Sequence, residues 1–132
     1  MRIMRTIQRL VVAAVLVVSA LALGPAAGAK AGDVIRTGAC SAASDWKLKL
    51  SPEDNGIQLE FQVDSNRVGQ TWRVRIRENG ILIFAGTRIT KAPSGSFTVR
   101  RLADDTAGTD AFRAAATNVA TGETCVGRAS IG

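Results

Sequence analysis

The chain has 132 residues and a formal net charge of +6, and it contains neither histidine nor tyrosine. The absence of histidine excludes Ser-His-Asp and Cys-His catalysis, and it removes the commonest ligand of zinc and copper sites. Once an export signal is set aside, the remaining length corresponds to one domain of ordinary size and leaves no room for a second.

The N-terminal part has the order of charged, apolar and small residues that is typical of a secretory signal peptide. Three arginines precede an apolar run over Leu10–Leu23, and small residues provide cleavage sites after Ala29 and Ala31. The run is shorter than the about 20 residues that span a bilayer, so an uncleaved anchor is the lesser alternative. The sequence predicts a signal peptide over 1–31, a single domain over 32–132, and a secreted protein without a membrane span.

The charge of the mature part is smaller than that of the whole chain. Arg2, Arg5 and Arg9 belong to the signal, so 14 of the 17 basic residues remain from Lys30 onward against all 11 acidic residues, a net charge of +3. Cleavage after Ala31 removes Lys30 as well and leaves +2. A mildly basic domain is no nucleic-acid signature, and we expect no nucleic-acid partner.

Alternation of apolar and polar residues predicts short strands along the whole domain. Ile57–Val63 alternates most clearly, and its apolar residues Ile57, Leu59, Phe61 and Val63 are expected to face the core. The other predicted strands are a short one around Cys40, followed by Asp45–Leu50, Thr71–Arg77, Ile81–Thr90, Phe97–Leu102 and Glu123–Ala129.

Asn79-Gly80 lies between two of these strands and is a strong hairpin signal, because a type I′ turn needs positive φ at both positions. A two-residue loop also sets the register of the two strands. The expected pairs are Glu78 with Ile81, Arg77 with Leu82, Ile76 with Ile83, and Arg75 with Phe84.

Residues 110–121 fit two structures. Phe112, Ala115, Ala116 and Val119 have helical spacing, whereas Phe112, Ala114 and Ala116 alternate as in a strand. We favour a strand, because strands precede it every 8 to 12 residues.

Cys40 and Cys125 are the two cysteines of the chain. Outside the cytoplasm such a pair most often forms a disulfide, and their separation excludes a C-x-x-C redox motif. The sequence predicts a bridge between the first and last strands.

The segment Asp105–Ala114 resembles the entry to the penultimate strand of immunoglobulin-like and fibronectin type III-like domains, and Trp72 resembles their core tryptophan. Phe112 replaces the usual tyrosine, and no cysteine follows it two positions on. The resemblance implies an all-β, immunoglobulin-like antiparallel β-sandwich of about seven strands with one disulfide. In size and export the chain also resembles the enediyne chromophore apoproteins, which carry two local disulfides instead.

The expected hairpin register places arginines and two large apolar residues on one outward face. This candidate binding face consists of Arg73, Arg75, Arg77, Leu82, Phe84 and Arg88. It suits an anionic partner such as an envelope polymer, because a guanidinium group can donate two parallel hydrogen bonds to one carboxylate or phosphate. The alternative is a solvated face, with the arginines balanced by Glu60 and the apolar pair covered by a loop.

No other motif indicates a site. Asp104, Asp105 and Asp110 provide oxygen ligands, but their spacing matches no calcium loop and favours turn and capping roles, as it does for Asp64 and its neighbours. We expect no metal, no cofactor and no enzyme activity, although a carboxylate-based hydrolase stays a minor alternative. The sequence indicates a secreted binding module for an envelope polymer or a secreted protein; a small-molecule carrier or enzyme inhibitor is the alternative.

Overall fold

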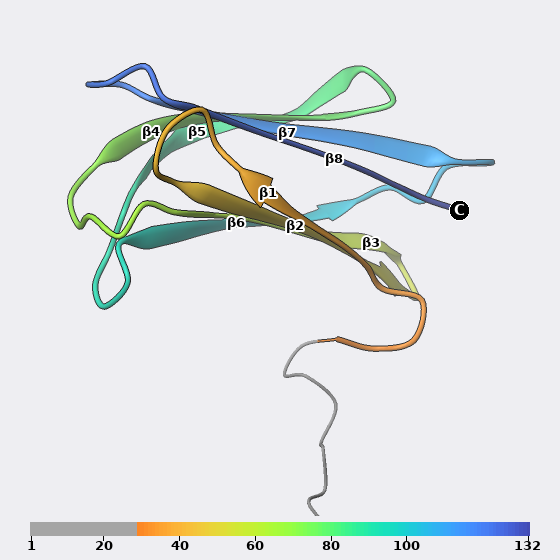
Figure 1. The fold of residues 1–132 in the computed structure, drawn as a ribbon. Helices are drawn as coiled ribbons and strands as arrows, with labels where there is room; N and C mark the ends of the chain where they lie inside the picture. The colour runs from red at the N-terminus through yellow and green to blue at the C-terminus, as the bar shows by residue number, and fades with distance from the viewer. Residues whose placement is uncertain (1–28) are drawn as a thin grey trace, which may run out of the picture.

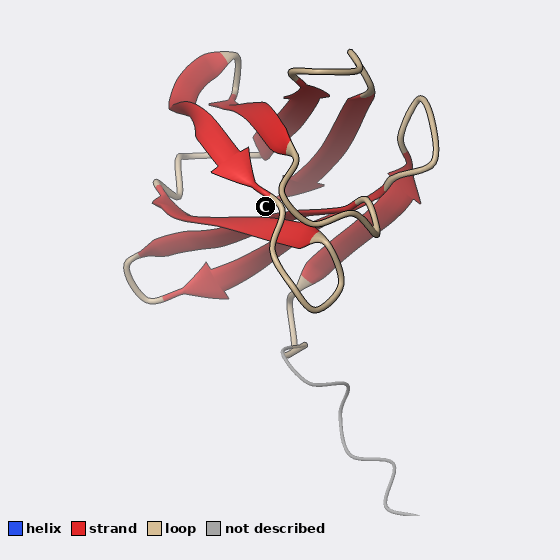
Figure 2. Cartoon of the chain, turned by 90° about the vertical axis from the view of Figure 1, so that its left-hand side faces the viewer, coloured by secondary structure: helices blue, strands red, loops and turns tan. Residues whose placement is uncertain are grey.

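The computed structural model describes residues 29–132, which form eight β-strands and no helix (Figure 2). No helix in this range is therefore long and apolar enough to cross a membrane. The signal peptide predicted over 1–31 lies almost entirely outside the described residues. The strands are β1 (Val34–Ala39), β2 (Asp45–Glu53), β3 (Gly56–Asp64), β4 (Thr71–Glu78), β5 (Ile81–Ile89), β6 (Ser96–Ala103), β7 (Asp110–Asn118) and β8 (Thr124–Ile131).

The strands form two antiparallel sheets that lie in two layers (Figure 1). One sheet has the order β1-β2-β3-β6, and the other has the order β5-β4-β7-β8. This two-sheet fold is compatible with an immunoglobulin-like sandwich, in which an extra edge strand can extend the sheet that holds the last two strands. The predicted all-β class with one disulfide is confirmed, with eight strands in place of about seven.

The core lies between the two sheets, because the inward side of each central strand carries mainly apolar side chains, with the polar residues at the strand ends. The four residues of β3 that were expected to face inward, Ile57, Leu59, Phe61 and Val63, are all buried. Trp72 of β4 is fully buried as well, and its ring centroid lies 6.3 Å from that of Phe97. Its indole N–H donates to the side chain of Gln70. Trp72 thus occupies the core position that the resemblance implied.

The ambiguous stretch after Asp110 is a strand, as favoured. Phe112, Ala114 and Ala116 are buried, and β7 pairs with β4 on one side and β8 on the other. The strand ends at Asn118, whose side-chain oxygen accepts hydrogen bonds from the backbone N–H groups of the following turn. Pairing with β4 and β8 satisfies the backbone of β7. A helix at this place would satisfy its own backbone but would leave the facing edges of β4 and β8 unpaired.

The first strand ends one residue before Cys40, whereas the sequence placed it around that cysteine. The Cys40 N–H donates to the carbonyl oxygen of Ser44, so the chain already turns toward β2 at this point. Cys40 and Cys125 form the predicted disulfide, with 4.3 Å between their Cα atoms.

Candidate functional site

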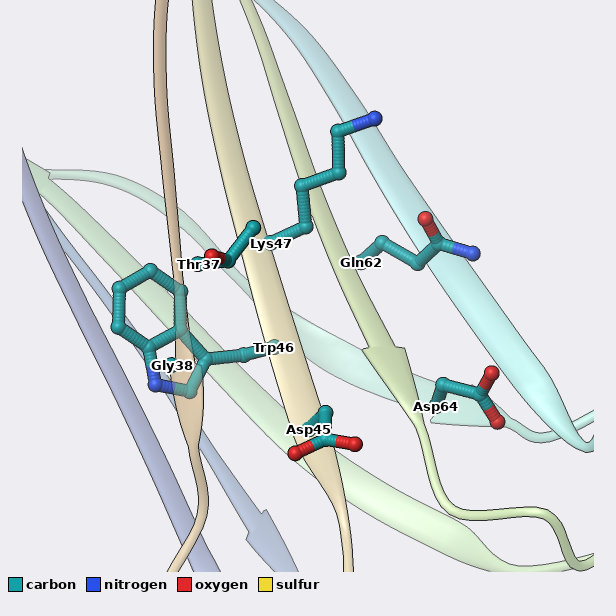
Figure 3. A pocket seen from close by; sticks show the side chains of 7 residues that line it. All are labelled: Thr37, Gly38, Asp45, Trp46, Lys47, Gln62 and Asp64. Carbon is teal, nitrogen blue, oxygen red and sulfur yellow. The ribbon is translucent and has the colours of Figure 1, made fainter.

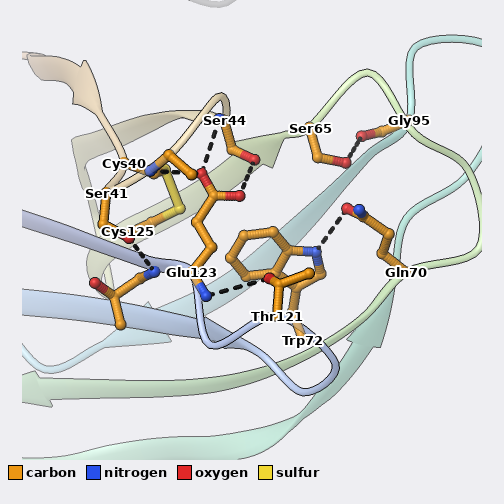
Figure 4. The surroundings of a disulfide bond; sticks show 12 residues. Cys40, Ser41, Ser44, Ser65, Gln70, Trp72, Gly95, Thr121, Glu123 and Cys125 are labelled. Carbon is orange, nitrogen blue, oxygen red and sulfur yellow. Dashed lines mark hydrogen bonds between the residues drawn. A yellow bond between two sulfur atoms is a disulfide. The ribbon is translucent and has the colours of Figure 1, made fainter.

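The disulfide closes the edge of the molecule where β1 and β8 meet (Figure 4). The Ser41 N–H donates to the Thr124 carbonyl oxygen, and the Thr124 N–H donates to the Ser41 hydroxyl. The Glu123 carboxylate accepts from the N–H groups of Ala42 and Ser44 and from the Ser44 hydroxyl. Backbone groups that are otherwise free at a sheet edge are thus bonded here.

The Trp46 side chain packs at the same edge, between β1 and β8. Its ring lies against two glycines, because a Cβ atom added at Gly38 of β1 would come within 2.6 Å of the ring and one added at Gly127 of β8 within 2.8 Å. A larger residue at either position would have to displace the ring, so the Trp46 side chain fills the space between β1 and β8 at this edge.

The hairpin between β4 and β5 begins as predicted and then departs from the predicted register. Asn79 and Gly80 both have positive φ, and Arg77 pairs with Leu82. A β-bulge follows at Ile83, so that Ile76 pairs with Phe84. The bulge reverses the sides of the later β5 residues, because one extra residue moves every following side chain to the opposite face.

The predicted binding face is therefore divided between the two sides of the sheet. Arg73, Arg75, Arg77 and Leu82 lie on the outer side. Phe84 and Arg88 do not, since they oppose the buried residues Ile76 and Trp72. The Arg88 guanidinium lies 5.0 Å from the centre of the Phe84 ring, so this arginine is engaged within its own strand. Placing Phe84 and Arg88 on the outer face was wrong, because the bulge turns both toward the core side.

Two arginines that the sequence analysis did not single out join the outer side. Arg113 of β7 pairs with Arg77, and Arg128 of β8 pairs with Arg113. Arg77, Arg113 and Arg128 thus form one row across three neighbouring strands. The row borders a hollow of about 390 Å³ that Gly80, Ala111 and Ser130 also line. We call the five outward arginines of β4, β7 and β8 the arginine face: Arg73, Arg75, Arg77, Arg113 and Arg128.

The charge of the arginine face is not balanced by neighbouring acids. Within residues 29–132 the three ion pairs are Lys30–Glu53, Lys49–Asp33 and Arg100–Glu60, and none includes an arginine of this face. Glu60 was expected to balance the arginines; it lies on β3 in the other sheet and binds Arg100 at 3.0 Å. Five of the 14 basic residues from Lys30 onward lie on this face. The other nine basic residues are distributed over the rest of the domain, which also holds all 11 acidic residues. The positive charge of the domain is therefore concentrated here.

Arg113 and Arg128 carry a signal in the sequence that is visible once their strands are assigned. Each lies in the outward phase of its strand, next to the buried residues Phe112 and Ala129. That β7 lies between β4 and β8 is a property of the topology, and the local pattern does not contain it.

An acidic cluster lies at the hairpin end, on the inner side of the same sheet. Glu78 of β4 is 6% exposed and Asp110 of β7 is fully buried. Burial, together with Asp110, Asp104 and Asp105, raises the pKa of Glu78 to about 7. Burial also acts to raise the pKa of Asp110, but hydrogen bonds from Thr106 and its other neighbours hold it below its usual value.

The side chain of Asp110 has a structural role, as the sequence favoured. It accepts hydrogen bonds from the Thr106 N–H and hydroxyl and from the side-chain amide of Asn79. These bonds tie the loop before β7 to the hairpin. Residues 29–132 contain no group of three or more acids and cysteines placed to hold a metal ion. Asp64 likewise accepts from the Asn66 N–H in a turn.

The outer side of the other sheet contains a second hollow, of about 450 Å³ (Figure 3). Lys47 and Gln62 point outward there, whereas the Trp46 ring extends to the opposite side, beside Gly38. Asp45 and Asp64 pair across β2 and β3 at its border. The lining combines polar and apolar surface and carries charges of both signs, so it is not the purely apolar cavity that a carried molecule would need.

Searches of protein-family models, curated proteins and solved structures give no match to this chain. The fold and the site thus define the class by themselves: an all-β protein of two antiparallel sheets, with one disulfide and one face of unpaired arginines.

Proposed function

We propose that this chain is a secreted, non-enzymatic binding protein of the immunoglobulin-like kind, and that its arginine face takes an anionic partner of the cell envelope. The observation that carries the proposal is the row of Arg77, Arg113 and Arg128. Like charges directly opposite one another destabilise a sheet, so three neighbouring guanidinium groups without carboxylate partners are costly for folding alone. An anion bound across the row offsets that repulsion.

The chemistry of the face favours phosphate or carboxylate groups. Guanidinium groups form paired hydrogen bonds with both, and several of them within about 5 Å of each other on adjacent strands suit a partner with repeated charges. The hollow beside the row gives such a group a place among the arginines. The disulfide is consistent with an extracellular protein, which supports a partner on the envelope.

Catalysis has less support than binding. Glu78 and Asp110 are the carboxyl pair with shifted pKa values, but both are buried and inaccessible to a substrate. Asp45 is exposed and Asp64 is half-buried, yet Asp64 is engaged in a turn, and the chain has no histidine. The carrier alternative would need an apolar cavity, whereas the hollows of about 450 and 470 Å³ are each lined mostly by polar and charged residues.

Co-sedimentation with purified cell envelope over a series of salt concentrations tests the proposal. We expect binding at low salt that weakens as salt rises, because exposed charges are screened beyond about 10 Å at 0.1 M salt. The variant Arg77→Gln/Arg113→Gln/Arg128→Gln should lose most of the binding.

A matched variant controls for net charge. Arg36→Gln/Lys47→Gln/Arg101→Gln also removes three positive charges, from exposed positions on the other sheet. It should bind as the unchanged protein does. Equal losses in the two variants would mean that net charge and not this face is responsible, and absence of binding at low salt would contradict the proposal outright.

A further inference from the structure

The arginine face also carries exposed apolar side chains. Leu82 is 42% exposed and pairs with Arg77 on the outer side of the sheet. At the other end of the sheet, Ile89 is 53% exposed and pairs with Thr71, and Val119 is 51% exposed and bonds through its N–H to the Thr71 carbonyl oxygen. Apolar side chains therefore lie at both ends of the column of β4 arginines.

The space between these ends contains small and hydroxyl side chains beside the arginines. Arg75 has Ala85 and Ala115 as its cross-strand neighbours. Arg73 has a threonine on each side, Thr87 and Thr117. Each arginine thus rises from a surface that offers no competing acid, and the face as a whole is both cationic and apolar.

A soluble polyanion would contact the arginines of this face but would make no use of its exposed apolar side chains. A hydrophilic polymer gains nothing from exposed leucine, isoleucine and valine, and residues 71–89 and 111–130 place no aromatic ring on the outer face for stacking against sugars or bases. Anionic lipid headgroups above acyl chains use both kinds of side chain, since basic residues bind the surface charge and apolar ones enter the acyl boundary.

We infer that the partner of the arginine face is the surface of an anionic lipid membrane. The guanidinium groups contact headgroup phosphates, and Leu82, Ile89 and Val119 reach the boundary between headgroups and acyl chains. This inference rests on the proposed function and specifies the class of partner for the same face.

The test compares vesicles with a soluble polyanion. The protein is the oxidised chain without residues 1–28, because the apolar run over Leu10–Leu23 would bind lipid by itself; the remaining residues contain all eight strands, the core and the disulfide. The probes are vesicles of equal parts phosphatidylglycerol and phosphatidylcholine, vesicles of phosphatidylcholine alone, and long-chain inorganic polyphosphate. We expect the protein to bind the vesicles that contain phosphatidylglycerol and not those of phosphatidylcholine alone.

Two variants separate the charged and the apolar contributions. Leu82→Thr/Ile89→Thr/Val119→Thr should weaken binding to anionic vesicles about tenfold and leave binding to polyphosphate unchanged. Arg77→Gln/Arg113→Gln/Arg128→Gln should weaken both. Urea unfolding of each variant confirms that it is folded.

The outcomes distinguish the two proposals. Binding to polyphosphate without binding to anionic vesicles would overturn the lipid inference and leave the anionic partner in place. Vesicle binding that the threonine variant retains in full would overturn it as well, since the apolar residues would then have no part. Binding to neither probe would overturn both proposals.

Discussion

Glu78 is the side chain whose protonation is most strongly coupled to folding. It faces Asp110 of β7 and the loop acids Asp104 and Asp105, and its pKa rises to about 7 from about 4.5. The folded state therefore holds the Glu78 proton more tightly than the unfolded state does. The stability due to this proton is complete below pH 4.5, declines as the pH rises toward 7, and is lost above that.

Glu78→Gln should remove this decline. We expect the unfolding free energy of the unchanged protein to fall by up to about 3 kcal/mol between pH 5 and pH 8 through this residue, and that of the variant to change much less. Urea titrations at the two pH values measure the difference. Glu53→Gln, at an exposed carboxylate, serves as control, and a variant as pH-dependent as the unchanged protein would contradict this account.

Gly127 shows how closely the closed edge is packed. Its Cα lies so near the Trp46 ring that an added methyl group would approach it within 2.8 Å. Gly127→Ala should lower the unfolding free energy by about 1 to 3 kcal/mol, as overpacked sites do. In the background of Trp46→Leu the same substitution should cost clearly less, which a double-mutant cycle by urea unfolding would measure; equal costs would refute the contact.

Strand pairing places three arginines in one row, and this arrangement has an expected cost at the level of the sheet. Arg113 lies between Arg77 and Arg128, so Arg113→Gln removes repulsion on both sides. The substitution should raise the unfolding free energy by about 0.2 to 1 kcal/mol at low salt, and the gain should shrink as salt screens the charges.

Arg100→Gln is the matched comparison for this prediction. Arg100 has an acidic partner, Glu60, at 3.0 Å, so its removal should give no gain. A loss of stability in Arg113→Gln at low salt would show that the row is stabilised within the protein and needs no external anion.

At the level of the strands, the sequence pattern predicted which residues face inward in β3 and β4 but not in the second part of β5. Alternation identified the inward residues of β3 and the outward arginines of β4, because a strand has a period of two and burial selects one side. The bulge at Ile83 left no comparable signal, since Ile83 and Phe84 are both apolar and either can pack against the core. The register rule therefore held up to Leu82 and failed beyond it.

Over the whole molecule, the disulfide joins positions 85 residues apart and so restricts most of the unfolded domain. Cys40→Ser/Cys125→Ser should lower the unfolding free energy by about 4 to 5 kcal/mol if loop entropy dominates. Guanidinium unfolding of the oxidised protein and the variant measures this. A loss below about 1 kcal/mol would mean that the Ser41–Thr124 and Glu123 hydrogen bonds close the edge without the bridge.

The arginine face is itself a property of the whole fold. Three of its members share β4 and could be predicted from alternation, whereas Arg113 and Arg128 join them only because the chain brings β7 and β8 beside β4. Nonlocal pairing of this kind has no local pattern, so the sequence revealed the arginines of one strand and not the extent of the site.

The most direct test of the arginine face is to observe its side chains. The Nε–Hε resonances of the arginines in the oxidised protein can be followed by NMR while polyphosphate is added. We predict shifts at Arg73, Arg75, Arg77, Arg113 and Arg128, with little change at Arg36, Arg88, Arg100 and Arg101. Equal shifts at all arginines, or shifts confined to the second group, would contradict the assignment of anion binding to this face.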